Sequence, residues 1–318
     1  MKMLLMILFL SIFCLILLPA QAVAGATEGL RLCGTAVIPA LLPFLFLTRL
    51  IVSYLPQAKS SKSYLGISSQ CWPAVLLGFI GGYPTGVSAA VSLYETGKAS
   101  KQDVQNTLRV CNNSGPGFFV SIIGLKLFQK PLVGFILYGI HLLSGILILL
   151  MNSTGSASYS IRRVPDEEKS FHQTFQEALV ASCSTMLQIC GTVILFSTLL
   201  SILRIILPAQ LLPLSGFLEI TTGILSLNAS PTSFVLCSIF MGWGGLCVHA
   251  QALSLWHRAG IAPKGYWRGK LLHGTLSGIL AYCLLLKNWI YPGLLLIIIL
   301  AFSLFRKKWG RKKQIHAL

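Results

Sequence analysis

Strongly apolar sequence that is interrupted by small and polar residues limits most how this chain can fold. Two such breaks lie close together, at residues 81–86 (GGYPTG) and 112–117 (NNSGPG). In hydrocarbon every backbone amide and carbonyl needs a partner within the protein, so irregular backbone persists only where protein or a water-filled cavity covers it. Transporters build substrate sites from interrupted helices of this kind. We therefore expect both breaks to point inward.

The composition indicates an integral membrane protein. Of the 318 residues, 54% are hydrophobic and only 10% are charged, and the mean hydropathy is +0.76. A soluble domain carries about 25% charged residues. Several apolar runs match the length of about 20 residues that a helix needs to cross a bilayer. The sequence thus predicts an all-α polytopic transmembrane protein with about 8–10 membrane segments, some of them broken or re-entrant.

The formal net charge of +17 does not indicate nucleic-acid binding. The basic residues stand in short loops and in the C-terminal tail, which is how the positive-inside rule distributes charge in membrane proteins. We expect the tail to be cytoplasmic and to lie near anionic lipid headgroups. Its basic residues are Arg306, Lys307, Lys308, Arg311, Lys312 and Lys313.

A polar linker over residues 152–170 divides the chain near its middle. Residues 1–24 resemble a signal peptide, but their apolar run is long and further membrane segments follow, so an uncleaved first helix is favoured. We predict an N-terminal transmembrane segment over 1–28, a first repeat over 29–151, a second repeat over 171–305 and a basic tail over 306–318. The membrane segments expected in the second half are 174–207, 212–227, 232–257, 271–286 and 289–305.

A fixed offset relates the two halves. Gly81 and Gly82 then fall on Gly244 and Gly245, and Gly97 falls on Gly260. We therefore predict two pseudo-repeats, with a second helix break near Gly244. The loop after Trp256 is purely basic and is predicted to be cytoplasmic; it contains Arg258, Lys264, Arg268 and Lys270. The loop after Tyr94 carries both signs of charge, and this difference allows inverted repeats as one hypothesis.

Polar residues inside membrane segments are costly, so each is a candidate for the functional site. Structural alternatives stay open for several of them. The Asn-Asn-Ser run can cap a half-helix, Glu219 can lie at the interface near Pro213, and His249 and Gln251 can form hydrogen bonds between helices. The candidate substrate-binding residues are Tyr83, Thr85, Asn112, Asn113, Ser114, Glu219, Thr222, His249 and Gln251.

The sequence contains no signature of an enzyme. It has no HExxH, GxSxG or P-loop motif, and its acidic residues are few and scattered. The cysteines form no CxxC pair and have no histidine at zinc-ligand spacing. We expect no catalytic residues, no metal site, no disulfide framework and no soluble cofactor.

Five segments in matching order resemble a known family. They are GGYPTG, LYETGKAS, CNNSGPGFF, LEITTG and GWGGLCVHAQ, and they span most of residues 29–286. They are similar to the YlbJ-type sporulation integral membrane proteins, which contain nucleoside-recognition (Gate) domains related to parts of concentrative nucleoside transporters. One departure is Gly81, where members often carry serine.

The resemblance implies a multi-pass transporter that moves dipicolinic acid, a small planar dianion, across the outer forespore membrane during sporulation. By motif, the candidate residues above would line its path. Two alternatives stay open: a nucleoside or nucleobase transporter, and a non-transporting scaffold of a sporulation complex. The expected partners are a small anionic substrate, membrane lipids, a proton or sodium ion as the coupling ion, and further copies of the chain in a homo-oligomer.

Overall fold

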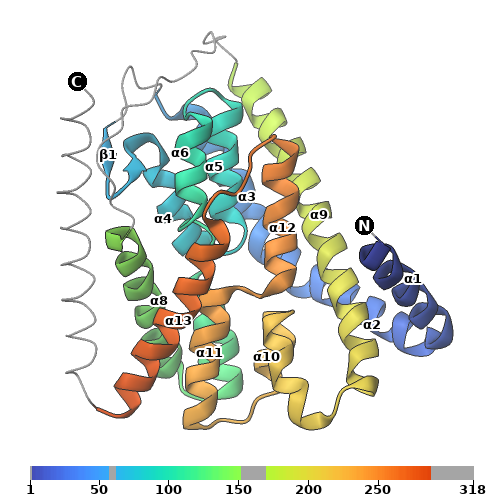
Figure 1. Ribbon diagram of the computed structural model, residues 1–318. Coiled ribbons are helices and arrows are strands. Elements are labelled where there is room, and N and C mark those ends of the chain that lie inside the picture. The colour runs from blue at the N-terminus through green and yellow to red at the C-terminus, as the bar shows by residue number, and fades with distance from the viewer. Residues whose placement is uncertain (1, 57–61, 152–169, 288–318) are drawn as a thin grey trace.

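The computed structural model describes residues 2–56, 62–151 and 170–287. The linker, the last expected membrane segment and the basic tail lie outside these residues, apart from Ser170 of the linker. Within the described part the regular secondary structure is helical, except for one short hairpin of β1 (Ser63–Tyr64) and β2 (Ile67–Ser68) (Figure 1). The all-α prediction is therefore confirmed.

The first half contains eight α-helices, joined in part by irregular helical turns. A π-helical turn, Cys33–Val37, joins α2 to α3; a 3-10 turn, Ser69–Cys71, precedes α4; and a π-helical stretch, Phe119–Leu127, follows α7. The α-helices are α1 (Lys2–Leu17), α2 (Pro19–Leu32), α3 (Ile38–Tyr54), α4 (Trp72–Gly81), α5 (Thr85–Glu95), α6 (Lys101–Leu108), α7 (Pro116–Phe118) and α8 (Pro131–Met151).

The second half begins with the longest helix of the described chain. A 3-10 stretch, Ala209–Phe217, follows this helix. The α-helices are α9 (Phe171–Ile206), α10 (Ile220–Leu225), α11 (Pro231–Trp243), α12 (Gly245–Arg258) and α13 (Tyr266–Leu285). The expected span over 212–227 is wrong, because α10 has only six residues and a helix rises about 1.5 Å per residue.

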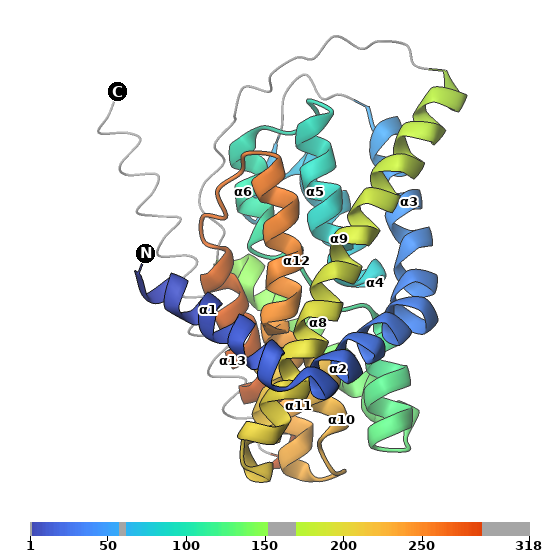
Figure 2. The ribbon, with the colours of Figure 1, turned by 90° about the vertical axis from the view of Figure 1, so that its right-hand side faces the viewer.

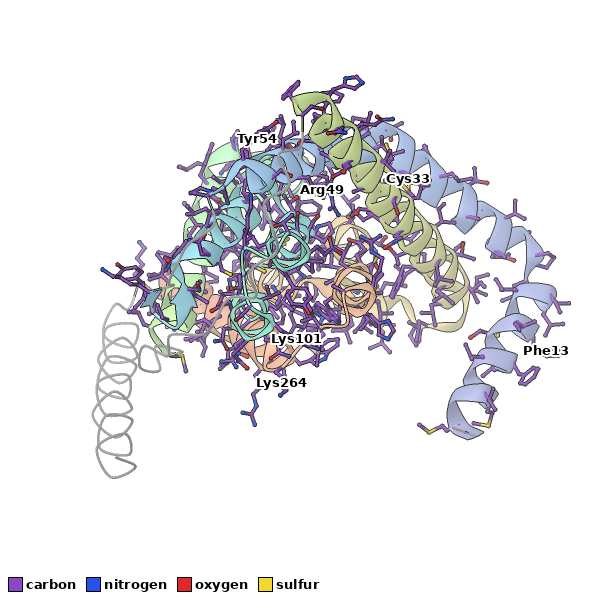
Figure 3. The ribbon with its side chains drawn as sticks, turned by 90° about the horizontal axis from the view of Figure 1, so that it is seen from above. Phe13, Cys33, Arg49, Tyr54, Lys101 and Lys264 are labelled. Carbon is purple, nitrogen blue, oxygen red and sulfur yellow. The ribbon has the colours of Figure 1, made fainter. Side chains whose placement is uncertain are left out.

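Four helical runs in the described residues are long and apolar enough to cross a membrane. They are Pro19–Tyr54, Pro131–Met151, Phe171–Ile205 and Pro231–Arg258. The first crosses the predicted boundary between residues 28 and 29, because the chain breaks at Leu18 and then continues as helix through Gly29. It changes direction at the π-helical turn before Pro39, and its α2 part packs across α9 (Figure 2). Helix α1, which carries Phe13, extends away from the bundle (Figure 3).

All three predicted breaks are present. Helix α4 ends at Gly81 before α5 begins at Thr85, the chain is non-helical between Arg109 and Gly115, and α11 passes into α12 at Gly244. Gly82 and Gly244 have φ angles of +80° and +99°, which glycine adopts without steric cost. These positions therefore favour glycine on backbone grounds.

The first break reverses the chain. A methyl group placed on Gly86 of α5 would lie 2.7 Å from the Cα atom of Gly78 in α4, so the two helices form a tight hairpin. The carbonyl of Cys111 fills the notch between these two glycines, because a methyl group on either would collide with its oxygen. In the second half α12 instead continues above α11 (Figure 1).

The hypothesis of inverted repeats is wrong for this structure. Helices α5 and α12 contact each other and run away from their breaks toward the same end of the molecule (Figure 1). Glu95 at the end of α5 and Arg258 at the end of α12 line one cavity there. Lys101 and Lys264, which follow these helices, lie near each other when the molecule is seen from that end (Figure 3).

The ends of α5 and α12 nevertheless share one geometry at corresponding positions. Gly97 and Gly260 have φ angles of +68° and +64°. Each glycine amide donates to the carbonyl three residues earlier, at 3.0 and 2.9 Å, and the next amide donates to the carbonyl five residues earlier, at 2.8 and 2.9 Å. This is the Schellman helix ending. It is consistent with duplicated halves, which remain a prediction.

Substitution of Gly86 tests the hairpin notch. We expect Gly86→Ala to destabilise the protein by about 1–3 kcal/mol, because the added methyl group forces the Cys111 carbonyl out of place. The matched control is Gly139→Ala in α8, where a methyl group meets no atom within 4 Å. The midpoint of thermal unfolding in detergent measures both, and equal midpoints for the two variants would contradict the packing described.

Candidate functional site

The three helix breaks meet inside the bundle. A methyl group on Gly82 would lie 3.2 Å from the amide nitrogen of Gly115, and one on Gly244 would lie 3.4 Å from the hydroxyl oxygen of Tyr83. The Tyr83 hydroxyl donates a hydrogen bond to the carbonyl of Met241, in the last turn of α11. The two glycine breaks therefore face each other.

A buried lysine lies where the breaks meet. Lys270 of α13 is 1% exposed, its Nζ donates to the carbonyl of Asn112 at 2.7 Å, and it lies 5.3 Å from the centre of the Tyr83 ring. Within the described part of the chain, no carboxylate lies within 4.0 Å of this ammonium group. The predicted loop position of Lys270 is wrong, because α13 already begins at Tyr266.

Tyr266 joins two of the predicted site residues. Its hydroxyl oxygen accepts from Asn112 Nδ2 at 2.7 Å and lies 2.8 Å from His249 Nδ1. Because Asn112 Nδ2 donates to this oxygen, the hydroxyl proton is available to donate to His249 Nδ1, and in that tautomer the histidine proton is on Nε2. His249 Nε2 is buried and has no partner from the protein, so in this tautomer it is an unused N–H donor.

Two further histidines stack beside this group. The rings of His141 in α8 and His273 in α13 lie 4.3 Å apart between centroids and 17° from parallel. His273 Nε2 donates to the carbonyl of His141 at 3.0 Å. His141 Nε2 accepts from the backbone amide of Ser114 at 3.4 Å. The pair therefore contacts the break at residues 112–117 directly.

Unsatisfied buried atoms concentrate in this region, which we call the central cluster and define as Tyr83, Asn112, Asn113, Ser114, His141, His249, Tyr266, Lys270 and His273. Oδ1 of Asn112, Oδ1 of Asn113, Nδ1 of His141 and Nε2 of His249 are buried without a protein partner. Such atoms are rare because each costs about 1–3 kcal/mol. Both donors and acceptors are therefore available for a polar ligand.

The structure brings together five of the nine predicted site residues, namely Tyr83, Asn112, Asn113, Ser114 and His249. The other four have local partners or positions. Thr85 donates to the Gly81 carbonyl, and Gln251 donates to Cys247 Sγ at 3.5 Å. Glu219 accepts from the amides of Thr221 and Thr222 at 3.0 and 2.7 Å and so caps α10. Thr222 stands in that capped turn.

Sequence reasoning missed Lys270, Tyr266 and the histidine pair as site residues. The available signal was spacing on α13, where Tyr266, Lys270, His273 and Ser277 recur every three or four residues and so share one helix face. All four are buried. An unbroken polar face on an otherwise apolar helix indicates a polar neighbour inside the protein rather than lipid.

Two cavities among the described residues lie outside the central cluster. A groove of about 520 Å³ between α11 and α13 is mostly apolar and includes Trp243, whose ring lies 4.4 Å from that of His249. A polar cavity of about 620 Å³ lies where α5 and α12 end, and it carries charges of both signs. Its charged residues are Arg49, Glu95, Glu177 and Arg258.

Tyr266→Phe tests the hydrogen-bond network of the central cluster. The change leaves Asn112 Nδ2 and His249 Nδ1 without their buried partner, so we expect a loss of stability of roughly 1–3 kcal/mol and a lower thermal midpoint. Tyr282→Phe on the same helix is the matched control, because Tyr282 is 56% exposed. Equal midpoints for Tyr266→Phe and Tyr282→Phe would show that the network contributes no stability.

Comparison with known proteins gives one informative likeness. The chain is 24% identical to the sporulation integral membrane protein YlbJ of Bacillus subtilis, over 82% of this chain and 77% of that protein. No family model matches the chain, and no solved structure matches it. Together with the apolar helices, the likeness makes this chain a multi-pass integral membrane protein that is related to a sporulation membrane protein.

Proposed function

We propose that this protein is a membrane transporter of a small anionic solute, which binds at the central cluster. The observation that carries the proposal is Lys270, a buried cation without a carboxylate partner in the described chain, placed where three helix breaks meet. Burying a charge is costly unless it is paired. A mobile anion that pairs with Lys270 during transport offsets this cost.

The surroundings of Lys270 offer further hydrogen-bond donors to an anion. Helix α12 begins at Gly245, and a methyl group placed on Gly244 would lie 3.5 Å from Cε of Lys270. The amino end of a helix carries a partial positive charge and free amides. His249, in the second turn of α12, adds its unpaired Nε2 donor.

Dipicolinic acid is the substrate that we favour. It is a planar dianion with a ring nitrogen, so it can accept hydrogen bonds from an ammonium group, amides and imidazole N–H groups at once. The sequence motifs described above and the likeness to a sporulation integral membrane protein both support a role in sporulation. On this proposal the protein acts in the outer forespore membrane.

A nucleoside or nucleobase is the second candidate substrate, and a specific observation favours it. The side-chain oxygens of Asn112 and Asn113 are buried acceptors without protein partners. A nucleobase carries N–H donors that match such acceptors, whereas dipicolinate at neutral pH has none. Competition between the two solutes for uptake distinguishes these candidates.

Flux through Lys270→Met protein in proteoliposomes tests the proposed function. We expect wild-type protein to move radiolabelled dipicolinate and Lys270→Met to reduce the rate at least tenfold, because the variant removes a charge-assisted hydrogen bond worth about 1.5–3 kcal/mol. Lys264→Met is the matched control, since Lys264 is an exposed lysine just before α13.

Three outcomes would count against the proposal as stated. Uptake of nucleoside without uptake of dipicolinate would favour the second candidate. Equal rates for Lys270→Met and wild-type protein would remove the lysine from the mechanism. No flux of either solute through correctly folded protein would favour a non-transporting scaffold.

A further inference from the structure

The stacked histidines of the central cluster point to a coupling ion. We propose that transport is coupled to protons, and that the pair His141–His273 takes up one proton when the anion binds beside Lys270. This inference rests on the proposed function and adds its energy source. It follows from three observations: the tautomers of the two rings, the contact of His141 with the break at residues 112–117, and the charges that face the pair.

Backbone partners assign both tautomers. A carbonyl can only accept, so His273 Nε2 carries a proton for its bond to the carbonyl of His141. An amide can only donate, so His141 Nε2 presents a lone pair to Ser114 and the ring proton is on Nδ1. His141 is therefore neutral in this arrangement, and His273 donates from Nε2. His141 Nε2 is the basic atom that faces the break.

Two donors suited to an anion are held by acceptors inside the protein. Lys270 Nζ donates to the carbonyl of Asn112, and the amide of Ser114 donates to His141 Nε2. Both bonds involve the non-helical stretch between α6 and α7. A proton from the aqueous phase that binds Nε2 forms an N–H bond there and ends the hydrogen bond from Ser114. The freed amide can then donate to a carboxylate of the solute.

The charges near the pair make protonation depend on the anion. The ring of His141 in α8 faces His273 and Lys270, which both belong to α13. It also faces Phe79 of α4 and Phe119 of the π-helical stretch. Tyr83, Tyr266 and His249 complete the titratable side chains of the central cluster. Among the described residues no carboxylate lies within 4.0 Å of either histidine. A proton on the empty pair would therefore repel Lys270 without any compensating negative charge.

A bound dianion changes this balance. One ammonium group and one proton on the histidine pair together neutralise two carboxylates, so the loaded site carries no net charge. A second proton is disfavoured because the two rings lie only 4.3 Å apart and like charges at that distance repel. A neutral loaded site costs far less to move through a low-dielectric interior than a charged one. The expected stoichiometry is one proton for each dipicolinate.

Buried hydroxyls extend the polar face of α13 beyond the histidines. Ser277 Oγ donates to Ser144 Oγ at 3.0 Å, and Ser238 Oγ donates to the carbonyl of Ser277 at 2.9 Å. All three side chains are buried. Ser144 Oγ in turn donates to the carbonyl of Ile140 at 2.8 Å. The hydroxyls therefore end at backbone carbonyls, and they keep the helix face below the histidines polar.

Proton movement in proteoliposomes tests the inference. Vesicles that contain wild-type protein and a trapped pH-sensitive dye are given dipicolinate outside. We expect proton entry together with dipicolinate, in a ratio near one, and an inward proton gradient should drive dipicolinate above its outside concentration. Dipicolinate flux without proton movement would overturn the coupling but leave the proposed function intact, whereas no flux at all would overturn both.

His141→Gln assigns the proton to the pair. Glutamine can still accept from Ser114 but cannot be protonated, so we expect gradient-driven accumulation to fall to the level of passive equilibration and proton entry per dipicolinate transported to fall toward zero. His257→Gln, at an exposed position of α12, is the matched control. His273→Gln serves as the second variant if His141→Gln does not fold. Full gradient-driven accumulation by a folded variant of either histidine would exclude that histidine as the proton carrier.

Discussion

The need to pair irregular backbone inside an apolar bundle is the constraint on which this structure depends. Residues 109–115 form no regular helix, yet most of their side chains are buried. Each neighbouring element contributes a close contact or a hydrogen bond to these residues. The α4–α5 hairpin offers a glycine notch to the Cys111 carbonyl, Gly269 of α13 lets the backbone at Arg109 approach, Lys270 binds the Asn112 carbonyl, and α8 contributes His141 to the Ser114 amide. Irregular backbone in a membrane survives only with such cover.

This requirement explains why structural and functional roles coincide in the central cluster. The side chains that pair with the backbone of the break at residues 112–117, or belong to it, are a lysine, histidines and asparagines. They retain unused hydrogen-bond donors and acceptors. A carbonyl that holds Lys270 in the empty protein competes with any anion for the same ammonium group. On the proposed function, binding exchanges one hydrogen bond for another rather than adding one, which allows the solute to leave again on the far side. The stability of the empty site and its affinity for an anion are thus set by the same groups.

The two glycine breaks serve this arrangement differently. The first reverses the chain, so that Tyr83 stands at the tip of a hairpin and reaches the carbonyl of Met241 in the other half. The second lets α12 continue from α11 and places a helix amino end beside Lys270. Helices α5 and α12 leave the breaks in the same direction (Figure 1). Similar sequence signals therefore give different local paths, because each break is completed by contacts with the other.

The sequence by itself determined the class of protein, the positions of all three breaks and the local cap of α6, where Ser100 and Asp103 form a capping box. These features depend on composition and near neighbours. It also identified the Asn-Asn-Ser run and His249 as candidate site residues. Only the tertiary structure decided that Lys270 is buried, that His141 stacks on His273 and that α5 and α12 run in the same direction. Lys270 follows Arg268 and resembles a loop residue, and the carbonyl that makes its burial tolerable lies 158 residues away. Local patterns carry no information about such a partner, because burial of a charge is settled by the groups that fold around it.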